Sequence, residues 1–404
     1  MKNEQRDFDV IVWGASGFTG RLVAEYLNSQ YGLDGDVTWA MAGRNAGKLG
    51  EVAASIGADT VPLVVADAND PISLGEMARR TKAIITTVGP YQNYGEPLVA
   101  ACAAAGTDYV DLSGEPPFMR KIIDQYSEEA KASGARIVHS CGFDSIPFDM
   151  GVFYVQRLAN EKFGKPALEV KGRVLAAKGG ASGGTVASAL TTIENIGDPL
   201  VRNVMKDIYA LAPDAAAKRP RQPNPNTPHY DRDTGKWVAP FIMAAINARN
   251  VHRSNMLMGY AYGENFQYSE MMAAPNAPAA FAIAGGLGGF AGALAFPPSR
   301  FLMKKTVLPN PGEGPSKKQR DEGFYKVLFV AKAESGETVK AMVKGDRDPG
   351  YGSTSKLIAE AALCLCDDID HTETPGGVYT PAAAMGDKLI KRLHERAGLT
   401  FEPA

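Results

Sequence analysis

The sequence predicts an α/β protein in which an N-terminal domain with a doubly wound parallel sheet precedes a second, α+β domain. Over residues 1–148, short apolar runs alternate with helical patterns, as expected where helices connect parallel strands. A glycine-rich turn directly follows the first of these runs, which is typical of a nucleotide-binding domain. From residue 149 onward the alternation ends, and segments with one polar and one apolar face indicate an antiparallel sheet.

The first domain is expected to contain six strands connected by helices, which is the arrangement of a Rossmann domain. The expected strands are residues 8–14, 37–43, 60–67, 82–89, 109–114 and 136–142. The carboxyl ends of parallel strands meet at one edge of a sheet. The loops that follow these strands are therefore expected to line a common ligand crevice.

Residues 149–350 are expected to form an α+β domain that holds the substrate and mediates dimerisation. Alternating faces predict a strand over 168–178, and the sequence ESGE predicts the turn of a hairpin over 324–346. Residues 351–404 contain two amphipathic helical patterns, the second with Thr380 as a suitable N-cap before a proline. We expect these C-terminal helices to pack back on the Rossmann domain.

The composition is that of an ordinary globular protein and argues against several functional classes. The 404 residues are 45% hydrophobic and carry a net charge of -2, so no basic surface for nucleic acid is expected. The four cysteines form no Cys-x-x-Cys pair and no metal-binding spacing with the five histidines, which predicts reduced thiols and no metal site. The first residues lack the apolar pattern of a signal peptide. We expect a cytoplasmic protein, with the inner face of the cell membrane as the alternative location.

The glycine-rich turn after the first strand is the strongest chemical signal in the sequence. Its glycines have the spacing G-x-x-G-x-x-G, a variant of the usual G-x-G-x-x-G pattern. Glycine lets the backbone approach a pyrophosphate, and the helix that follows offers free N–H groups and the positive end of its dipole. The alternative is a glycine-rich turn without a ligand. The residues predicted to bind the cofactor here are Gly14, Ser16, Gly17, Phe18, Thr19 and Gly20.

The end of the second strand predicts which nicotinamide cofactor binds. NAD sites place Asp or Glu there to bind the ribose hydroxyl, whereas this chain has Arg44 and, a turn later, Lys48. Because a guanidinium suits a phosphate, we predict NADP(H), with Arg44 at the 2′-phosphate. The alternative for Arg44 is an exposed side chain without a ligand. Asp67, at the end of the third strand, is predicted to lie near the adenine or to cap the next helix.

The loops after the fourth and sixth strands are expected to complete the site. Their predicted cofactor-binding residues are Val88, Gly89, Pro90, Tyr91, Gly142 and Phe143. Tyr91 and Asp144 are the candidate catalytic proton donors, because both follow strands at this edge. The alternatives are that Tyr91 only stacks beside the nicotinamide and that Asp144 caps the next helix. Other polar residues near these strand ends are further candidates: Tyr94, Asp111, Ser113, Glu115 and Ser145.

The motifs of several other enzyme classes are missing from the sequence. No tyrosine has a lysine four residues later, which argues against the short-chain dehydrogenase mechanism, and there is no P-loop or zinc ligand cluster. His139 lies inside an apolar strand and is expected to be a packed core residue. Hydride transfer needs few protein groups, because the cofactor carries the hydride and the protein supplies position and a proton donor.

An uncharged stretch interrupts the second domain over 271–299. Its apolar, glycine-rich core, 277–296, is about as long as a bilayer core is thick if it is helical. Three interpretations are open: a buried core segment or a contact in a homodimer, a peripheral membrane attachment through 277–305, and a transmembrane span. In a peripheral attachment, basic residues that follow the stretch face anionic lipid: Arg300, Lys304 and Lys305.

The chain as a whole resembles the saccharopine dehydrogenase-like oxidoreductases, in particular the branch that includes the mycobacterial trans-acting enoyl reductases. The matching blocks are GASGFTG (14–20), AGR (42–44), VGPYQNYGEPLVAACAAAGTDYVDLSGE (88–115), HSCGFDSIPFDMG (139–151), SGGT (182–185), GDRDPGYGSTSKLIAEAALCL (345–365) and GGVYTPAAAMGDKLI (376–390). This resemblance implies an NADP-type Rossmann domain and a second α/β domain. It also implies, in some relatives, reduction of a double bond in a lipid-like substrate. It implies no particular catalytic residue.

We therefore expect an NADPH-dependent oxidoreductase that reduces a double bond of a hydrophobic, acyl or isoprenoid substrate. The uncharged stretch favours a lipid over a polar amino acid, because a lipid can be drawn from a membrane. One alternative is a saccharopine-type C–N oxidoreductase acting on an amino-acid conjugate. Its several carboxylates would need converging cations, for which Arg173, Arg202 and Arg253 are candidates. The other alternative is a non-catalytic NADP-binding protein at the membrane.

Overall fold

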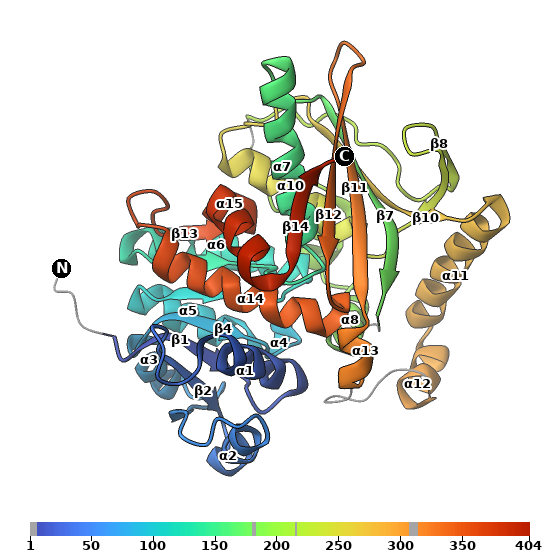
Figure 1. Cartoon of the computed structure of the whole chain (residues 1–404). Helices are drawn as coiled ribbons and strands as arrows, with labels where there is room; N and C mark the ends of the chain where they lie inside the picture. Colours follow the sequence, from blue (N-terminus) through green and yellow to red (C-terminus); the bar gives the residue numbers. More distant parts are fainter. Residues whose placement is uncertain (1–5, 180–182, 215, 307–313) are drawn as a thin grey trace.

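The computed structural model describes residues 6–179, 183–214, 216–306 and 314–404. These residues form two seven-stranded sheets with helices around them (Figure 1). In Figure 1 the first sheet lies in the blue and cyan N-terminal part, and the green, orange and red strands of the second sheet rise above it. The predicted class, a parallel Rossmann sheet followed by an α+β unit, is confirmed.

The first sheet is parallel throughout and has the order β13-β6-β5-β4-β1-β2-β3. Its first six strands along the chain follow the order expected for a Rossmann domain. They are β1 (Phe8–Trp13), β2 (Trp39–Gly43), β3 (Leu63–Val65), β4 (Thr81–Thr86), β5 (Asp108–Val110) and β6 (Arg136–Val138). The seventh strand, β13 (Gly377–Tyr379), comes from the C-terminal region and was not predicted.

Helices cover both faces of this sheet because its side chains alternate between two buried clusters. Val10 and Val12 pack with α1 and with α14 (Thr354–Leu363). Ile11 and Trp13 pack in the other cluster with α3, α5 and α6. The helices of the domain are α1 (Phe18–Tyr31), α2 (Ala46–Ser55), α3 (Pro71–Arg79), α4 (Tyr91–Tyr94), α5 (Glu96–Ala105) and α6 (Pro116–Ser133).

The second sheet has the order β14-β12-β11-β7-β10-β9-β8 and is antiparallel except for the pair β7 and β10. Its strands are β7 (Glu169–Lys178), β8 (His229–Asp231), β9 (Lys236–Pro240), β10 (Gln267–Ala274), β11 (Phe324–Lys332), β12 (Thr338–Gly345) and β14 (Leu399–Pro403). The strand predicted over 168–178 and the hairpin predicted over 324–346 are both confirmed as β7 and as β11 with β12. The accompanying helices are α7 (Ile146–Phe163), α8 (Gly183–Glu194), α9 (Pro199–Lys206), α10 (Ala244–Leu257) and α13 (Lys317–Asp321).

The C-terminal region packs back on the Rossmann domain, as predicted. Glu360 of α14 is buried and accepts hydrogen bonds from two tyrosines of α1, Tyr26 at 2.6 Å and Tyr31 at 2.7 Å. Arg392, in α15 (Pro381–Arg392), donates to the same carboxylate at 2.6 Å. This region also adds β13 to the first sheet and β14 to the second. Helix α7 spans residue 148, which is the predicted end of the first domain. One buried apolar cluster extends from Val10 to residues of β11, so the two sheets share a core.

The uncharged stretch forms α11 (Ala277–Ala295), followed by α12 (Pro297–Thr306). By length and composition α11 could cross a membrane, yet only 11% of it is buried. Figure 1 shows α11 and α12 at the edge of the molecule, beyond β10. The interpretation of 277–296 as a core segment within one chain is therefore wrong, because the helix contacts the body along a single flank. The side chains of Lys304 and Lys305 lie outside the described part of the chain.

Candidate functional site

The turn between β1 and α1 is built for close backbone contacts that only glycine permits. Gly14 has a φ of 85°, and a Cβ on it would lie 2.6 Å from Cγ2 of Val88. A Cβ on Gly20 would lie 2.2 Å from the carbonyl oxygen of Gly14. The first turn of α1 thus lies directly against the end of β1, the packing expected of a dinucleotide-binding turn.

The amino end of α1 is open to an anion. Gly17 is the N-cap, so no side chain caps the helix, and the first turn contains no acidic residue. Ser16 and Gly17 are exposed, and Phe18 and Thr19 are half-buried. The free N–H groups and the positive end of the helix dipole therefore remain available to a pyrophosphate.

The end of β2 offers cations and no carboxylate. Arg44 and Lys48 are exposed, and among the described residues neither side chain has a hydrogen-bond or ion-pair partner. Asn45 caps α2 by accepting from the Lys48 N–H at 3.0 Å, and the first turn of α2 lacks an acid. Asp67 is half-buried and accepts from the Asn69 N–H at 2.9 Å. Asp70 and not Asp67 is the N-cap of α3, and the place of Asp67 near the adenine stays a prediction.

Tyr91 is a buried structural residue at the end of β4. Its hydroxyl donates to the Thr86 carbonyl and accepts from the Leu112 N–H, both at 3.1 Å. Burial raises the pKa of the phenol well above its usual value. Because the hydroxyl is occupied by the backbone of two strand ends, the geometry favours neither proton donation by Tyr91 nor its stacking beside a nicotinamide. The Gly89–Pro90 peptide bond that precedes it is cis.

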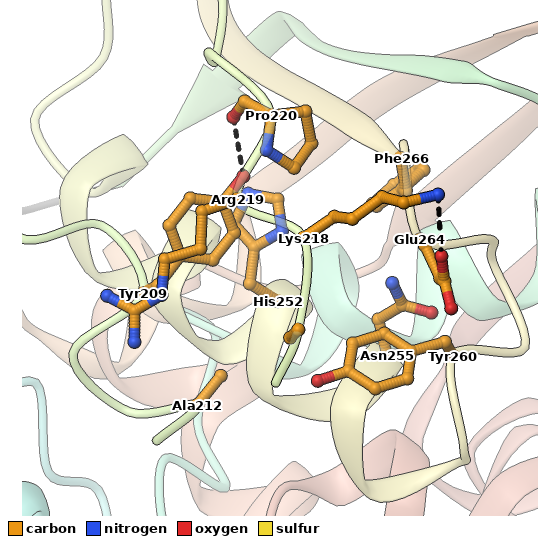
Figure 2. Close-up of a pocket in the computed structure, with 11 residues that line it drawn as sticks. Tyr209, Ala212, Lys218, Arg219, Pro220, His252, Asn255, Tyr260, Glu264 and Phe266 are labelled. Atoms are coloured by element: carbon orange, nitrogen blue, oxygen red, sulfur yellow. Dashed lines mark hydrogen bonds and ion pairs between the residues drawn. The ribbon is translucent and has the colours of Figure 1, made fainter. Parts of the chain in front are cut away.

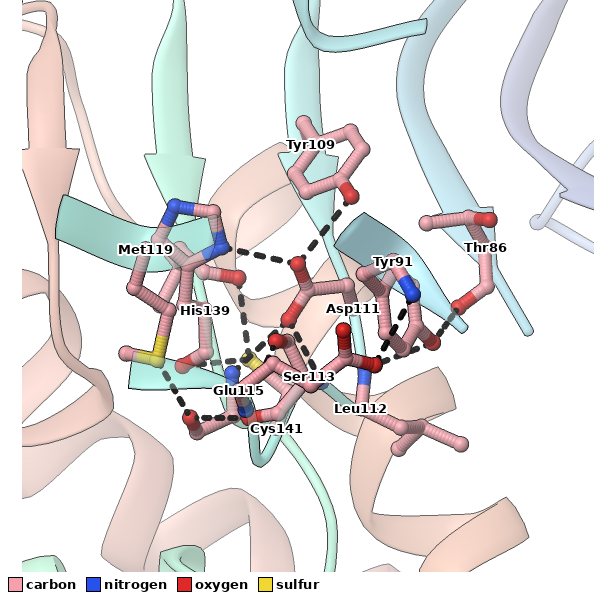
Figure 3. A network of polar contacts seen from close by, with 12 residues as sticks. Thr86, Tyr91, Tyr109, Asp111, Leu112, Ser113, Glu115, Met119, His139 and Cys141 are labelled. Carbon is pink, nitrogen blue, oxygen red and sulfur yellow. Dashed lines mark hydrogen bonds and ion pairs between the residues drawn. The ribbon is translucent and has the colours of Figure 1, made fainter. Parts of the chain in front are cut away.

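Asp111 organises the ends of β5 and β6 (Figure 3). Its carboxylate accepts from the backbone N–H groups of Ser113 and Ser140, both at 2.9 Å. It also accepts from the Tyr109 hydroxyl at 3.0 Å and lies 2.7 Å from Nδ1 of His139. All five residues are buried. His139 is thus a packed core residue, as predicted, and Asp111 positions the two loops rather than facing a ligand.

Glu115 joins the Rossmann crevice to the second domain. This fully buried carboxylate accepts from the backbone N–H groups of Tyr91 and Gln92, both at 2.8 Å. It also accepts from the hydroxyl of Ser188 on α8 at 2.6 Å. The Gln92 amide donates to the hydroxyl of Thr192, also on α8, at 3.0 Å. Helix α8 is therefore held across the carboxyl end of β4.

The segment Pro349–Ser353, where the second domain meets the C-terminal region, contacts the glycine-rich turn. Its Tyr351 ring packs edge-on against Phe18, with 4.8 Å between the ring centroids. The Tyr351 hydroxyl accepts from the backbone N–H of Gly183, at the start of α8. The side chain of Phe18 thus contacts this segment, and only its backbone belongs to the helix end predicted to meet the cofactor.

A buried polar chain runs from the start of α7 into the second sheet. Ser145 donates to Oδ1 of Asn247 at 3.2 Å, and the Asn247 amide donates to Glu270 at 2.8 Å. The Tyr268 hydroxyl donates to the same carboxyl at 2.7 Å. Burial raises the pKa of Glu270 to about 8, and the negative charge of nearby Asp144 adds to this. Asp144 itself is half-buried, two residues before α7, whose N-cap is Ser145.

Comparison with known proteins identifies the family. Residues 10–138 match the family described as the saccharopine dehydrogenase NADP binding domain. The chain is 43% identical over 417 residues to a Mycobacterium tuberculosis protein that is provisionally named a trans-acting enoyl reductase, covering 100% of this chain and 99% of that protein. The chain belongs to the saccharopine dehydrogenase-like family, in its trans-acting enoyl reductase branch. The trans-acting enoyl reductase of Mycobacterium ulcerans is 42% identical over 414 residues, 97% of each chain.

This saccharopine dehydrogenase-like protein is an NADP-dependent oxidoreductase with NADP(H) as its cofactor. Its fold is that of the apo saccharopine dehydrogenase of Saccharomyces cerevisiae, with a TM-score of 0.55 and 13% identity, covering 98% of this chain and 100% of that one. The residues at the crevice fit the cofactor, because the cradle of Gly14 and Gly20 leaves no room for a Cβ. Arg44, exposed at the end of β2, stays the predicted partner of the 2′-phosphate.

Two predicted cofactor residues of this oxidoreductase lie differently from expectation. The Phe143 ring is buried against Tyr325, with 4.6 Å between centroids, and the Phe143 N–H donates to the hydroxyl of Thr354. Gly142 is buried, and a Cβ there would lie 2.9 Å from Cδ2 of Leu112. Both residues pack the loop after β6 against neighbouring elements, so their predicted contact with the cofactor is not supported by this geometry.

Residues of the second domain and of the C-terminal region that contact the Rossmann loops were missed from the sequence. Ser188, Tyr351 and Thr354 each contact a Rossmann loop across more than 70 positions of the chain. The only signal for them was their place inside blocks that resemble the family, at or near 182–185 and 345–365. A local sequence pattern cannot show which Rossmann loop each of these residues contacts.

A separate pocket of this oxidoreductase lies wholly within the second domain (Figure 2). Lys218 and Glu264 form an ion pair of 2.9 Å at its rim, and the Tyr209 hydroxyl donates to the Pro220 carbonyl. Burial lowers the pKa of His252 to about 3, so this histidine is neutral near pH 7. All lining residues fall between 209 and 266, so the pocket is not part of the Rossmann crevice.

Proposed function

We propose that this oxidoreductase uses NADPH to reduce a carbon–carbon double bond in a hydrophobic, acyl or isoprenoid substrate. The observation that carries the proposal is that two of the three candidate arginines in the second domain are already bonded to other residues of the fold. Arg173 is buried in an ion pair with Asp231 at 2.6 Å, and Arg253 donates to the carbonyls of Leu211 and Val378. A substrate with several carboxylates needs free, converging cations.

The full-length relatives support the same direction. They are named trans-acting enoyl reductases, and they match at 43% and 42% identity.

The third candidate cation, Arg202, is exposed on α9. The saccharopine-type alternative would therefore have to bind its carboxylates without the two buried arginines, which are already paired within the fold.

The chemistry divides between the cofactor and the chain. When bound, NADPH would supply the hydride for one carbon of the double bond, with a proton for the adjacent carbon, so that the substrate gains two hydrogens and NADP⁺ remains. The turn at Gly14 and the open end of α1 would hold the pyrophosphate, and Arg44 would hold the 2′-phosphate. Helix α8, fixed to Glu115, borders the side of the crevice where the substrate would lie.

We infer that Asp144 supplies the proton. Support comes from its position after β6, among the loops that follow the carboxyl ends of the parallel strands. Asp144 is half-buried beside these loops, where a general acid would meet the substrate.

Turnover with defined substrates tests the proposal. Purified protein is mixed with NADPH and either a long-chain 2-enoyl thioester or 2-oxoglutarate with lysine, and NADPH absorbance is followed. We expect oxidation of NADPH with the enoyl thioester and a product heavier by two hydrogens. Oxidation with 2-oxoglutarate and lysine alone would support the C–N alternative instead. Cofactor binding without turnover on either would support a non-catalytic protein.

A further inference from the structure

Helix α11 is an apolar element that the fold leaves largely uncovered. It contains no charged residue, has a mean hydropathy of 1.5, and is 11% buried. Phe281 is 56% exposed, and Phe296 and Phe301, in or next to α12, are each 62% exposed. Exposed apolar surface of this extent on a folded protein marks a binding surface.

The apolar character of α11 continues all the way around the helix. A Cβ built on any of its five glycines would meet no atom within 4 Å, so none of them is required for packing within this chain. These glycines are Gly285, Gly286, Gly288, Gly289 and Gly292. A surface helix that binds a water-soluble partner keeps a polar face, whereas one that is apolar on all sides belongs in a core or in lipid.

The attachment of α11 determines how it can meet lipid. Ala280 is fully buried against Ala239 and Ala274 of the second sheet, and Ile283 packs beside them. Because this flank is held by the sheet, the helix cannot be surrounded by lipid as a spanning helix is. It can only lie at a membrane surface with its other sides in the acyl boundary.

Aromatic residues with polar groups lie beside the first turns of α11. The Trp237 ring is centred 6.5 Å from that of Phe281 and 6.2 Å from that of Tyr230, which is 52% exposed. Trp and Tyr gather at the boundary between lipid and water, where their rings and polar groups are both satisfied. We propose that α11, with Tyr230 and Trp237, docks the protein on a phospholipid bilayer.

The docking surface is joined to the crevice through α8. Helix α11 contacts α8, and Arg300 of α12 lies 3.9 Å from Glu194 at the end of α8. Helix α8 also carries Ser188, which donates to Glu115 at the crevice. This part of the inference rests on the proposed function: a hydrophobic substrate would pass from the bilayer along α8 to the cofactor.

Vesicle binding tests the docking surface without any need for turnover. Full-length protein is mixed with vesicles of phosphatidylcholine and phosphatidylglycerol, and the bound fraction is measured by flotation. We expect the wild type to float and the double variant Phe281→Asp with Phe296→Asp to bind at least about tenfold more weakly, since two phenylalanines lose apolar contact. Ile72→Asp, at a residue 73% exposed on α3, is the matched control and should bind as the wild type does.

Tryptophan fluorescence locates the contact. Trp13 and Trp39 are each 3% exposed in the Rossmann core, so Trp237 is the indole that senses lipid at α11. Emission should shift to shorter wavelength on adding vesicles, and Trp237→Phe should abolish the shift. Unchanged melting temperature and NADPH affinity in each variant show that the fold is intact.

Three results would overturn docking on a bilayer: a folded wild type that stays unbound at millimolar lipid, a double variant that floats as well as wild type, or a dimer in light scattering that the double variant converts to a monomer. The last would assign α11 to a contact between two copies. A protein that binds vesicles but reduces no enoyl substrate would overturn the proposed function and leave the docking surface standing.

Discussion

Ser188 on α8 donates a 2.6 Å hydrogen bond to the carboxylate of Glu115, which lies at the start of α6. The same carboxylate accepts from the first two backbone N–H groups of α4. One buried acid therefore sets the distance between a Rossmann loop and a helix of the second domain. This contact is the structural basis for expecting substrate to meet cofactor between α4 and α8.

Ser188→Ala should weaken this link selectively. Loss of a hydrogen bond to a buried carboxylate costs about 1–3 kcal/mol of unfolding free energy. We expect the KM for the enoyl substrate to rise while the Kd for NADPH stays unchanged, because α8 does not touch the glycine-rich turn through this residue. Ser55→Ala, at an exposed position of α2, is the control. Equal changes in KM and in the NADPH Kd would contradict the placement of substrate beside α8.

Gly20→Ala should abolish most cofactor binding. The added Cβ would lie 2.2 Å from the Gly14 carbonyl oxygen, so α1 must move away from the turn that we propose holds the pyrophosphate. We expect NADPH affinity, measured by calorimetry, to fall by at least tenfold, about 1.4 kcal/mol. Gly50→Ala, in α2 where a Cβ meets nothing within 4 Å, should bind normally and gain up to about 1 kcal/mol of stability. Normal NADPH binding by Gly20→Ala would refute the pyrophosphate site.

Much of the Rossmann half could be predicted from the sequence because its information is local. The run from Phe8 to Gly20 carries the strand, the turn and the helix start in consecutive residues. His139 was predicted to be a core residue from its apolar neighbours alone. The cations at Arg44 and Lys48 follow directly from the position at which β2 ends.

The remainder depended on contacts between distant segments. Phe143 follows a strand at the ligand edge, yet its ring packs on Tyr325, 182 positions later. The tyrosine at 91 also follows such a strand, and only the fold shows that its hydroxyl turns back to the backbone of Thr86. Strand β13 has three residues and no alternation of polar and apolar side chains, so no local pattern in the sequence predicts its pairing with β6.

Asp144→Asn tests the proposed proton donor. An amide cannot deliver the proton, so we expect kcat to fall by about a hundredfold or more while NADPH binds as in the wild type. Asp70→Asn, which keeps an N-cap on α3, is a control remote from the crevice. A variant at position 144 with wild-type kcat across the pH range would remove Asp144 from the reaction.

Glu270→Gln should flatten the dependence of stability on pH. The pKa of Glu270 is raised from 4.5 to about 8, so the unfolded chain releases a proton that the folded chain retains. The contribution of Glu270 to the free energy of unfolding is therefore fully present below about pH 4.5 and is lost as pH rises toward about 8. Glutamine mimics the protonated acid, so urea denaturation of the variant should show a smaller loss over this range.

Asp149 should make the free energy of unfolding depend on pH in the same direction as Glu270 does, so it offers a second test. Burial raises its pKa from 3.8 to about 7, and it accepts from Ser254 and from the backbone N–H of Ala382 at the start of α15. Combining Glu270→Gln with Asp149→Asn should flatten the profile further. If the Glu270 variant loses stability with pH as steeply as the wild type, that carboxyl is ionised in the folded protein.

The central claim is that the amino end of α1 holds a nicotinamide dinucleotide and that Arg44 selects its phosphorylated form. The most direct test is calorimetric titration of wild type, Arg44→Asp and the control Arg79→Asp with NADPH and with NADH. We predict that wild type and control bind NADPH much more tightly than NADH, and that Arg44→Asp loses this preference. Equal binding of both cofactors by the wild type, or an unchanged preference in Arg44→Asp, would contradict the account.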